Sequence, residues 1–189
     1  DIFGQYIDYY GNILTSESNG IEFSIAANDQ NGASSTYLST SNTVTVCWED
    51  FRNGLHWDVY CRNFNGNNQT LDSEFVLSDN IGDQLNPYLF TSLEQTVLIV
   101  WEDFRNGANE YSDIYIQELV TNGINYGNGG IVVCDAFHNQ VNPRVDILSH
   151  NVNSSYLIYW DDMRSSGKED LINVFSQSFS NDEATGLIL

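Results

Sequence analysis

The chain has very few basic residues. One lysine and five arginines stand against 26 acidic residues in a chain of 189, which gives a net charge of −20. A field of this sign repels nucleic-acid phosphates and anionic lipid headgroups. We therefore expect no nucleic-acid partner and no binding to a membrane surface.

Long apolar runs and metal or catalytic motifs are also missing. The longest apolar run, TVLIVW at residues 96–101, is short enough for a strand, whereas a membrane-spanning helix needs about 20 such residues. The three cysteines form no C-x-x-C pair, and no histidine stands at zinc-ligand spacing. No GxSxG elbow accompanies the three histidines. The sequence thus predicts no membrane span, no structural zinc, no required cofactor and no catalytic residues.

The sequence does contain a repeat. WEDFRNG occurs at residues 48–54 and again at 101–107, and WDDMRSSG begins at Trp160. A glutamine heads QNGA, QLNP and QVNP, and a short apolar segment reads DIFGQ, DVYCR, DIYIQ and NVFSQ. These markers recur every 53–60 residues, so one supersecondary unit is repeated along the chain.

Within one repeat, apolar and polar residues alternate, and Asn, Gly and Asp clusters interrupt them. This pattern is typical of strands and turns, and we expect no helix. In the second repeat it predicts four antiparallel strands, at residues 87–90, 96–103, 113–119 and 130–135. A lone sheet of this size cannot cover both of its faces and must stack on its neighbours. The predicted fold is therefore an all-β β-propeller of four-stranded antiparallel blades.

The boundaries give about three and a half blades. One propeller region covers residues 1–189, with a half blade at 1–26 and blades at about 30–78, 84–135 and 140–189. Closed propellers have about four to eight blades, and an open arc leaves bare strand edges. We expect the chain to be part of a larger propeller, or a protein partner or further copies of the chain to complete or cap it.

The order Q..P, then a strand ending in WxDxRxG, then DIYxQ resembles the TolB-type β-propeller repeats and the related repeats of secreted and surface proteins. The resemblance covers residues 1 to about 177, with Ala33 in place of proline and Asn173 in place of aspartate. It implies a non-catalytic binding platform, although some such propellers accompany catalytic modules.

The repeated motif is interpreted as architecture. Each tryptophan is expected to pack between blades, opposite the aromatic residue of the next strand: Tyr60, Tyr115 and Phe175. Each arginine is expected between two carboxylates, Asp50 and Asp58 in the first copy, while Gly54 and Gly107 supply a positive φ. The motif residues are Trp48, Asp50, Arg52, Trp101, Asp103, Arg105, Trp160, Asp162 and Arg164.

Calcium is the alternative ligand. Acidic turns offer oxygen atoms in flexible loops, as this cation prefers, and Asp79 and Asp83 are the candidate ligands. The arginine within WEDFRNG repels a cation, so the repeated motif itself is a poorer candidate.

The tryptophan register places Cys47 opposite Cys61 on neighbouring strands. A cross-strand disulfide is one interpretation. Val100 and Ile116 occupy the same positions in the next repeat, so two small buried thiols are the other.

Two sequons, at Asn68 and Asn153, are candidate glycosylation sites and fit an exported protein. The predicted location is extracellular or on a cell surface, with the periplasm as an alternative. The predicted function is a binding, adhesion or assembly scaffold, and the alternatives are a propeller module of a secreted glycan-acting hydrolase and a lectin. Trp57 lies outside the repeated tryptophan position and is a candidate for stacking on a sugar ring or on a protein partner, or for packing between blades.

Overall fold

The computed structural model describes residues 1–14, 19–106, 111–120, 123–149, 155–164, 173–182 and 186–188; for 149, 173–182 and 186–188 it describes the backbone alone. Every regular element in these residues is a β-strand, as the alternating pattern predicts. The strands are β1 (Ile2–Gly4), β2 (Ile21–Ser24), β3 (Gln30–Leu38), β4 (Thr43–Asp50), β5 (Asp58–Asn65), β6 (Thr70–Leu71), β7 (Phe75–Ser78), β8 (Gln84–Thr91), β9 (Val97–Asp103), β10 (Asp113–Val120), β11 (Gly123–Ile124), β12 (Ile131–Cys134), β13 (Gln140–Ser149), β14 (Ser155–Asp162), β15 (Asn173–Asp182) and β16 (Gly186–Ile188).

The strands form four antiparallel sheets in sequence order. Sheet I contains β1–β2, sheet II contains β3–β7, sheet III contains β8–β12, and sheet IV contains β13–β16. Sheets II and III have five strands where four were expected, because two short strands share the edge of the third strand: β6 and β7 both pair with β5, and β11 and β12 both pair with β10. Sheet I has two strands, as expected for a half repeat.

The same turn geometry leads into the first strand of each full sheet. Gln84 Nε2 donates hydrogen bonds to the backbone carbonyls of Asn80 (3.1 Å) and Gly82 (2.7 Å), and Gln30 and Gln140 bind their own turns in the same way. Two residues later the chain takes a positive φ, at Gly32, Asn86 and Asn142, where each first strand shifts register. The glutamine and the Asn or Gly therefore fix where each sheet begins.

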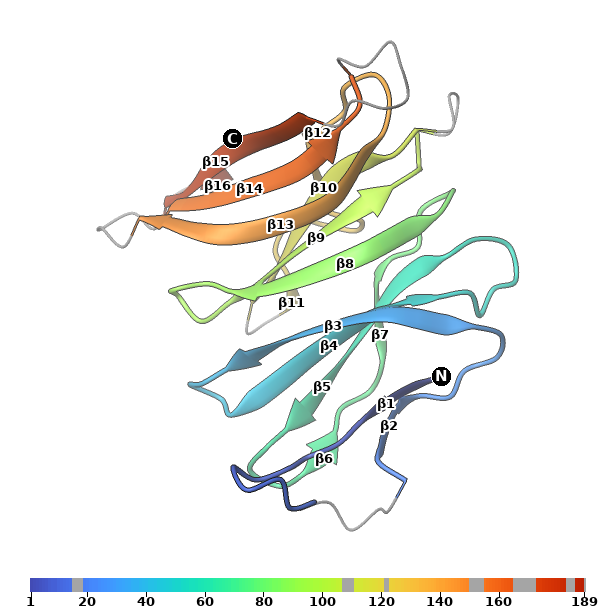
Figure 1. The fold of residues 1–189 in the computed structure, drawn as a ribbon, viewed down its shortest axis with the longest axis vertical. Helices are drawn as coiled ribbons and strands as arrows, with labels where there is room; N and C mark the ends of the chain where they lie inside the picture. Colours follow the sequence, from blue (N-terminus) through green and yellow to red (C-terminus); the bar gives the residue numbers. More distant parts are fainter. Residues whose placement is uncertain are drawn as a thin grey trace.

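The four sheets stack face to face in series. Figure 1 shows them following one another along the chain, with β3, β8 and β13 side by side. Sheets I and II enclose one apolar core (Ile2, Phe23, Val46, Trp48 and Phe64), sheets II and III a second (Cys47, Val59, Cys61, Leu77, Leu89, Val97, Ile99, Trp101 and Tyr115), and sheets III and IV a third (Leu98, Val100, Ile114, Ile116, Val133, Val145, Tyr156, Ile158 and Trp160).

The position of a sheet in the series decides whether it buries one face or two. In sheet III every residue of β9 is buried, because sheets II and IV cover both faces. In sheet IV the residues of β14 alternate between buried and half-buried, because sheet III is the one sheet that packs on them in the described part of the chain. The described sheets form an open series and close no ring, so the propeller and its blade number stay predictions.

Candidate functional site

Each copy of the WxDxR motif lies at the junction between its own sheet and the preceding one. The tryptophan lies two residues before the end of the second strand of a sheet, and its side chain packs toward the sheet before it. Trp48 and Trp101 are fully buried, and Trp160 is nearly so. The backbone register pairs them with Tyr60, Tyr115 and Phe175, as predicted from the sequence.

The aspartate two residues later binds both other members of its motif. Trp101 Nε1 donates to Asp103 Oδ2 at 2.8 Å, and the backbone amide of Arg105 donates to Asp103 Oδ1 at 2.9 Å. The guanidinium of Arg105 adds two more hydrogen bonds, from Nε (2.9 Å) and Nη2 (2.5 Å). Asp50 and Asp162, like Asp103, are fully buried and make the same four kinds of contact. We call each Trp, Asp and Arg set a clamp.

The arginine of each clamp also reaches the preceding sheet. Arg52 Nη2 lies 3.4 Å from Ser24 Oγ at the end of β2, and Arg105 Nη2 lies 3.5 Å from Ser78 Oγ at the end of β7. Arg164 Nη2 lies 3.0 Å from Cys134 Sγ at the end of β12. The thiol of Cys134 therefore occupies the place of a hydroxyl in the two earlier repeats.

The expectation that each arginine lies between two carboxylates is wrong for the second carboxylate. The guanidinium of Arg52 lies 3.8 Å from the ring centroid of Tyr60 and forms an ion pair with Glu74 at 2.8 Å. Asp58 instead accepts a hydrogen bond from Asn53 Nδ2 at 2.8 Å. The asparagine of the turn reaches this second aspartate because the arginine turns toward the preceding sheet.

The same arrangement recurs in the second copy. Arg105 lies 3.8 Å from the ring centroid of Tyr115, and Asn106 Nδ2 donates to Asp113 Oδ2 at 2.6 Å. The asparagine of WEDFRNG is thus a structural residue that the sequence interpretation missed. The sequence could have indicated this role, because the same Asn stands in both full copies of the motif.

In the first repeat the pKa values of the two aspartates, Asp50 and Asp58, are shifted in opposite directions. Burial by itself raises the pKa of Asp50 and of Asp162, but the hydrogen bonds from the arginine and the tryptophan together hold each pKa below its usual value. Burial raises the pKa of Asp58 and Asp113, which have no arginine bonded to them. Asp50 and Asp162 are therefore held in the ionised form.

Of the two turn glycines, Gly54 has φ of 70°, as predicted. Gly107 lies outside the described residues.

A second set of contacts joins the sheets through the acidic residue that follows each tryptophan. The backbone amide of Asn86 donates to Glu49 Oε1 of the preceding sheet at 2.7 Å, and Asn86 Nδ2 donates to Glu102 Oε1 of its own sheet, also at 2.7 Å. Asn142 repeats the pattern toward Glu102 (2.8 Å) and Asp161 (2.9 Å). We call this alternation of acids and asparagines the acid–amide ladder.

Sequence reasoning missed the acid–amide ladder. Its two signals were the acid directly after each tryptophan and the Gly or Asn two residues after each glutamine. Burial raises the pKa of Glu49 and of Glu102, and hydrogen bonds from the next sheet oppose this shift only in part. These carboxyls are thus positioned by packing and amide donors, with no catalytic partner among the contacts described.

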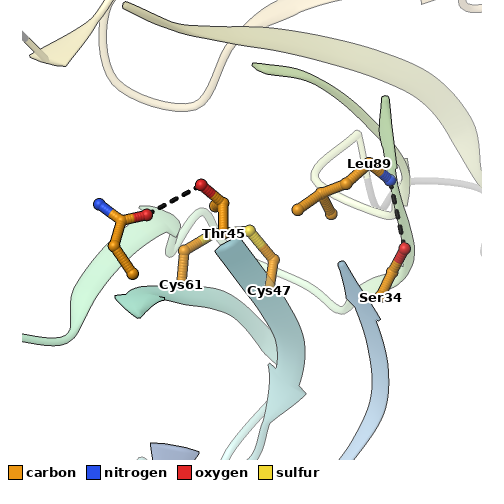
Figure 2. Close-up of a disulfide and its surroundings, with 6 residues drawn as sticks. Ser34, Thr45, Cys47, Cys61 and Leu89 are labelled. Atoms are coloured by element: carbon orange, nitrogen blue, oxygen red, sulfur yellow. Dashed lines mark hydrogen bonds between the residues drawn. A yellow bond between two sulfur atoms is a disulfide. The ribbon is translucent and has the colours of Figure 1, made fainter. Parts of the chain in front are cut away.

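Cys47 and Cys61 form a disulfide, which decides between the two interpretations of these cysteines. Their sulfur atoms are 2.05 Å apart, and both residues are fully buried. Figure 2 shows the disulfide facing Leu89 of sheet III, whose backbone amide donates to Ser34 Oγ at 3.3 Å. Cys134 remains a free thiol, and burial raises its pKa.

The calcium candidates Asp79 and Asp83 belong to no cluster of acidic side chains in the described residues. Asp83 Oδ1 already accepts a hydrogen bond from the backbone amide of Trp57 at 2.9 Å. In the part of the chain with described side chains, no three His, Cys, Asp or Glu residues are grouped to hold a metal ion. Calcium binding at Asp79 and Asp83 therefore stays a prediction without geometric support.

One of the two sequons lies within the described residues. Asn68 is exposed in the turn between β5 and β6, and its Oδ1 accepts a hydrogen bond from Thr70 Oγ1 at 2.7 Å. Asn153 lies outside the described residues.

No helix that is long and apolar enough to cross a membrane occurs among the described residues. Comparison with models of known protein families and with curated protein sequences finds no match.

Proposed function

We propose that this chain is a region of a non-catalytic β-propeller that serves as a binding, adhesion or assembly scaffold. The observation that carries this proposal is the clamp. In all three copies the polar groups of Trp, Asp and Arg bind one another and the preceding sheet, so the most repeated motif of the sequence joins sheets together. A catalytic site is normally one asymmetric constellation, whereas the clamp recurs in each of sheets II, III and IV.

The propeller interpretation rests on the regular stacking of the sheets. In each of the three junctions the tryptophan of the later sheet packs on the earlier sheet, and the arginine reaches the end of the earlier sheet's last strand. Repetition of one junction around an axis produces a propeller, with each sheet as a blade. Sheet I is then the half blade, and sheets II, III and IV are the three full blades.

The scaffold role rests on the sheets at the two ends of the series. Phe3 of sheet I is 49% exposed, whereas its counterpart Tyr115 in sheet III is 8% exposed, and Leu148 of sheet IV is 55% exposed. Exposed apolar patches mark contact sites with other proteins. A protein partner or further copies of the chain are the proposed occupants.

The proposed location is extracellular or on a cell surface. Its support is the Cys47–Cys61 disulfide, since such bonds persist in oxidising compartments. Exposure of Asn68 is compatible with glycosylation at that sequon.

A glycan-acting hydrolase is less well supported by the geometry. Such an enzyme needs two carboxyls that flank one substrate bond and are free to exchange protons with it. The buried acids Glu49 and Glu102 are equivalent members of successive repeats, and each accepts hydrogen bonds from the following sheet.

A lectin is the second candidate, because aromatic side chains gather at one end of the sheets. The rings of Phe51 and Trp57 are 5.1 Å apart, and those of Tyr111 and Phe137 are 5.3 Å apart in the next repeat. Phe137 is 64% exposed and Trp57 is half-buried, and aromatic rings that reach the surface can stack on sugar rings. A glycan array probed with the wild-type chain and with Trp57→Ala tests this role, and binding that the substitution abolishes would favour the lectin.

The scaffold proposal is tested by two measurements on the purified chain. Sedimentation velocity over a wide concentration range should show self-association that grows with concentration, because Phe3 and Leu148 expose apolar surface on the outer sheets. A panel of chromogenic glycosides should show no turnover above the buffer rate. Turnover that Glu102→Gln removes, or a chain that stays monomeric and captures no purified protein or glycan ligand, would contradict the proposal.

A further inference from the structure

Asn–Gly pairs are frequent in this chain. Seven occur in its 189 residues, beginning at Asn19, Asn31, Asn53, Asn65, Asn106, Asn122 and Asn128. Asparagine is a thermolabile residue, because its side-chain amide can react with the backbone nitrogen of the residue that follows. Glycine in that position favours the reaction, since it has no Cβ to hinder the approach. The structure distinguishes these pairs by how firmly their reacting groups are held.

The reaction takes place within one pair and needs no partner except water. The backbone nitrogen of the glycine attacks Cγ of the asparagine, the new C–N bond closes a five-membered succinimide, and the bond from Cγ to Nδ2 breaks. Nδ2 leaves as ammonia and takes the proton of the glycine amide. Water then opens the ring at either carbonyl, which gives isoaspartate or aspartate. Hydrogen bonds that hold the glycine amide or the asparagine side chain therefore slow the reaction.

The pair Asn53–Gly54, in the first copy of WEDFRNG, is held at both groups. The backbone amide of Gly54 donates to the carbonyl of Phe51 at 2.9 Å. Asn53 Nδ2 donates to Asp58 Oδ2 at 2.8 Å, and Asn53 Oδ1 accepts from the backbone amide of Leu55, also at 2.8 Å. Both groups must leave these hydrogen bonds before they can react, so the folded chain protects this pair.

Two further pairs are held in other ways. The backbone amide of Gly66 donates to the carbonyl of Asn42 at 2.8 Å, and Asn65 Oδ1 accepts from the backbone amide of Asn67 at 2.9 Å. Asn31 lies within β3, where the extended backbone turns the next nitrogen away from the side chain. Three pairs include or directly follow residues outside the described part of the chain, namely those at Asn19, Asn106 and Asn122.

The pair Asn128–Gly129 differs, because neither of its reacting groups is held. Asn128 is exposed in the turn between β11 and β12. Among the residues that the structure describes, its side chain makes no hydrogen bond, and the backbone amide of Gly129 donates none. Gly127 and Gly130 flank the pair, both with φ of 69°, and carry no side chain that restricts rotation of the backbone. The turn therefore lets the nitrogen of Gly129 approach Asn128 Cγ.

This turn is attached to sheet III on both sides of Asn128. Gln117 Nε2 donates to the carbonyl of Gly127 at 2.8 Å, and Arg105 Nη2 donates to the carbonyl of Gly129 at 2.6 Å. Arg105 belongs to the clamp of sheet III, and a Cβ on Gly129 would lie 3.0 Å from its Nη1. Isoaspartate carries one additional carbon in the backbone. At position 128 it lengthens the chain between the two attachments.

We propose that Asn128 is a site of spontaneous modification, at which ring closure with Gly129 produces isoaspartate and aspartate, and that the isoaspartate loosens the clamp of sheet III. The longer backbone moves the carbonyl of Gly129 away from Arg105. The arginine then loses one of its acceptors and keeps its hydrogen bonds with Asp103. This modification is a property of the chain that does not depend on the scaffold function.

The first test compares the folded chain with the unfolded chain. Both are incubated at mildly alkaline pH, one in buffer and one in urea, and then digested with trypsin. Tandem mass spectrometry locates isoaspartate in the fragments. In the folded chain Asn128 should convert at least about tenfold faster than Asn53 and Asn65, which must first leave their hydrogen bonds, and in urea the three should convert at similar rates. Equal rates in the folded chain would overturn the proposal.

Asn128→Gln is the matched variant, because glutamine keeps the amide but must close a six-membered ring, which forms much more slowly. After long incubation the wild type should unfold at a lower urea concentration than before, whereas Asn128→Gln should not change. Asn31→Gln removes an exposed Asn–Gly pair of β3 and should lose as much stability on incubation as the wild type. Asn128→Ser serves if Asn128→Gln unfolds the chain, and circular dichroism checks the fold of each variant.

Limited digestion of the folded chain reports on the clamp itself. Cleavage by trypsin after Arg105 should become at least about threefold faster once Asn128 has converted, because proteolysis follows the population of the open form. Arg52 is the internal control: it pairs with Glu74 at 2.8 Å and should be cleaved at an unchanged rate. Cleavage after Arg105 that does not change, or incubated wild type that unfolds as before, would overturn the proposed effect on the clamp.

Discussion

The backbone amide of Asn86 in sheet III donates a hydrogen bond of 2.7 Å to Glu49 Oε1 in sheet II. One repeat later, the amide of Asn142 donates to Glu102 Oε1 at 2.8 Å. These contacts give each sheet a polar connection to its neighbour in addition to the apolar core. They also place the buried carboxyls of Glu49 and Glu102 at the junctions between sheets, where ionisation of a carboxyl lowers the stability of the fold.

Glu102→Gln should stabilise the chain at neutral pH. Burial raises the pKa of Glu102, so the folded state loses stability as the pH rises through this pKa and the carboxyl ionises. Glutamine stays neutral, and its Oε1 can accept the same hydrogen bonds from Asn86 and Asn142. Urea unfolding should show a more stable variant at pH 7, with a difference that vanishes below about pH 4.

The matched control for this substitution is Glu22→Gln, at an exposed position of β2. It should change the free energy of unfolding by less than about 0.5 kcal/mol. If Glu102→Gln destabilises the chain at pH 7, the ionised carboxylate is needed at the junction, and the inference that its ionisation destabilises the folded state is wrong.

Asp103→Asn should be one of the most damaging single substitutions. The carboxylate is fully buried and pairs with Arg105, whose side chain is only 16% exposed, so removal of one charge leaves the other poorly compensated. A loss of about 3–5 kcal/mol is typical for a broken buried pair. Guanidinium unfolding measures it.

The equivalent change Asp162→Asn serves as the comparison. It should cost less than Asp103→Asn, because the side chain of Arg164 is 34% exposed and water can solvate it. Equal losses at the two sites would argue against this account of the clamp.

Reduction of the Cys47–Cys61 disulfide should destabilise the chain by about 3 kcal/mol. The unfolded chain then regains the conformational entropy that the closed loop, with a sequence separation of 14, had removed. A double variant, Cys47→Val with Cys61→Ile, carries the residues that the next repeat has at Val100 and Ile116. Thermal unfolding with and without dithiothreitol should shift for the wild type alone. A wild-type chain that is insensitive to the reductant would contradict the prediction.

Cys134→Ser should be tolerated, because serine occupies the same place at Ser24 and Ser78 and binds the arginine of the next sheet there. Cys134→Val removes the acceptor of Arg164 and should cost about 1 kcal/mol. Urea unfolding of the two variants distinguishes them, and similar losses in both would show that the contact with Arg164 is not important.

Alkylation of Cys134 tests its environment independently. Burial raises the pKa of this thiol, so its reaction with iodoacetamide at pH 8 should be slower than that of a short cysteine peptide. A faster reaction would mean that Arg164 dominates over burial.

The sequence by itself determined that the chain is all-β and which residues of the second and third strands lie opposite each tryptophan. The alternation of apolar and polar residues predicts an all-β chain, and the spacing of Trp48, Trp101 and Trp160 predicts which residues lie opposite one another. Both are local properties, because side chains alternate along a strand and short turns fix antiparallel pairing. The register of Cys47 with Cys61 followed from the same reasoning.

Only the tertiary structure decided what the arginines, asparagines and acids of each repeat bind. Arg52 reaches Ser24, and Asn86 reaches Glu49, across a junction between two sheets, whereas sequence reasoning placed the arginine between two carboxylates of its own hairpin. These partners lie 28 and 37 residues apart in the chain, and no local pattern encodes the distance between two stacked faces. The choice between a disulfide and two thiols likewise depended on the approach of Cys47 to Cys61 in space.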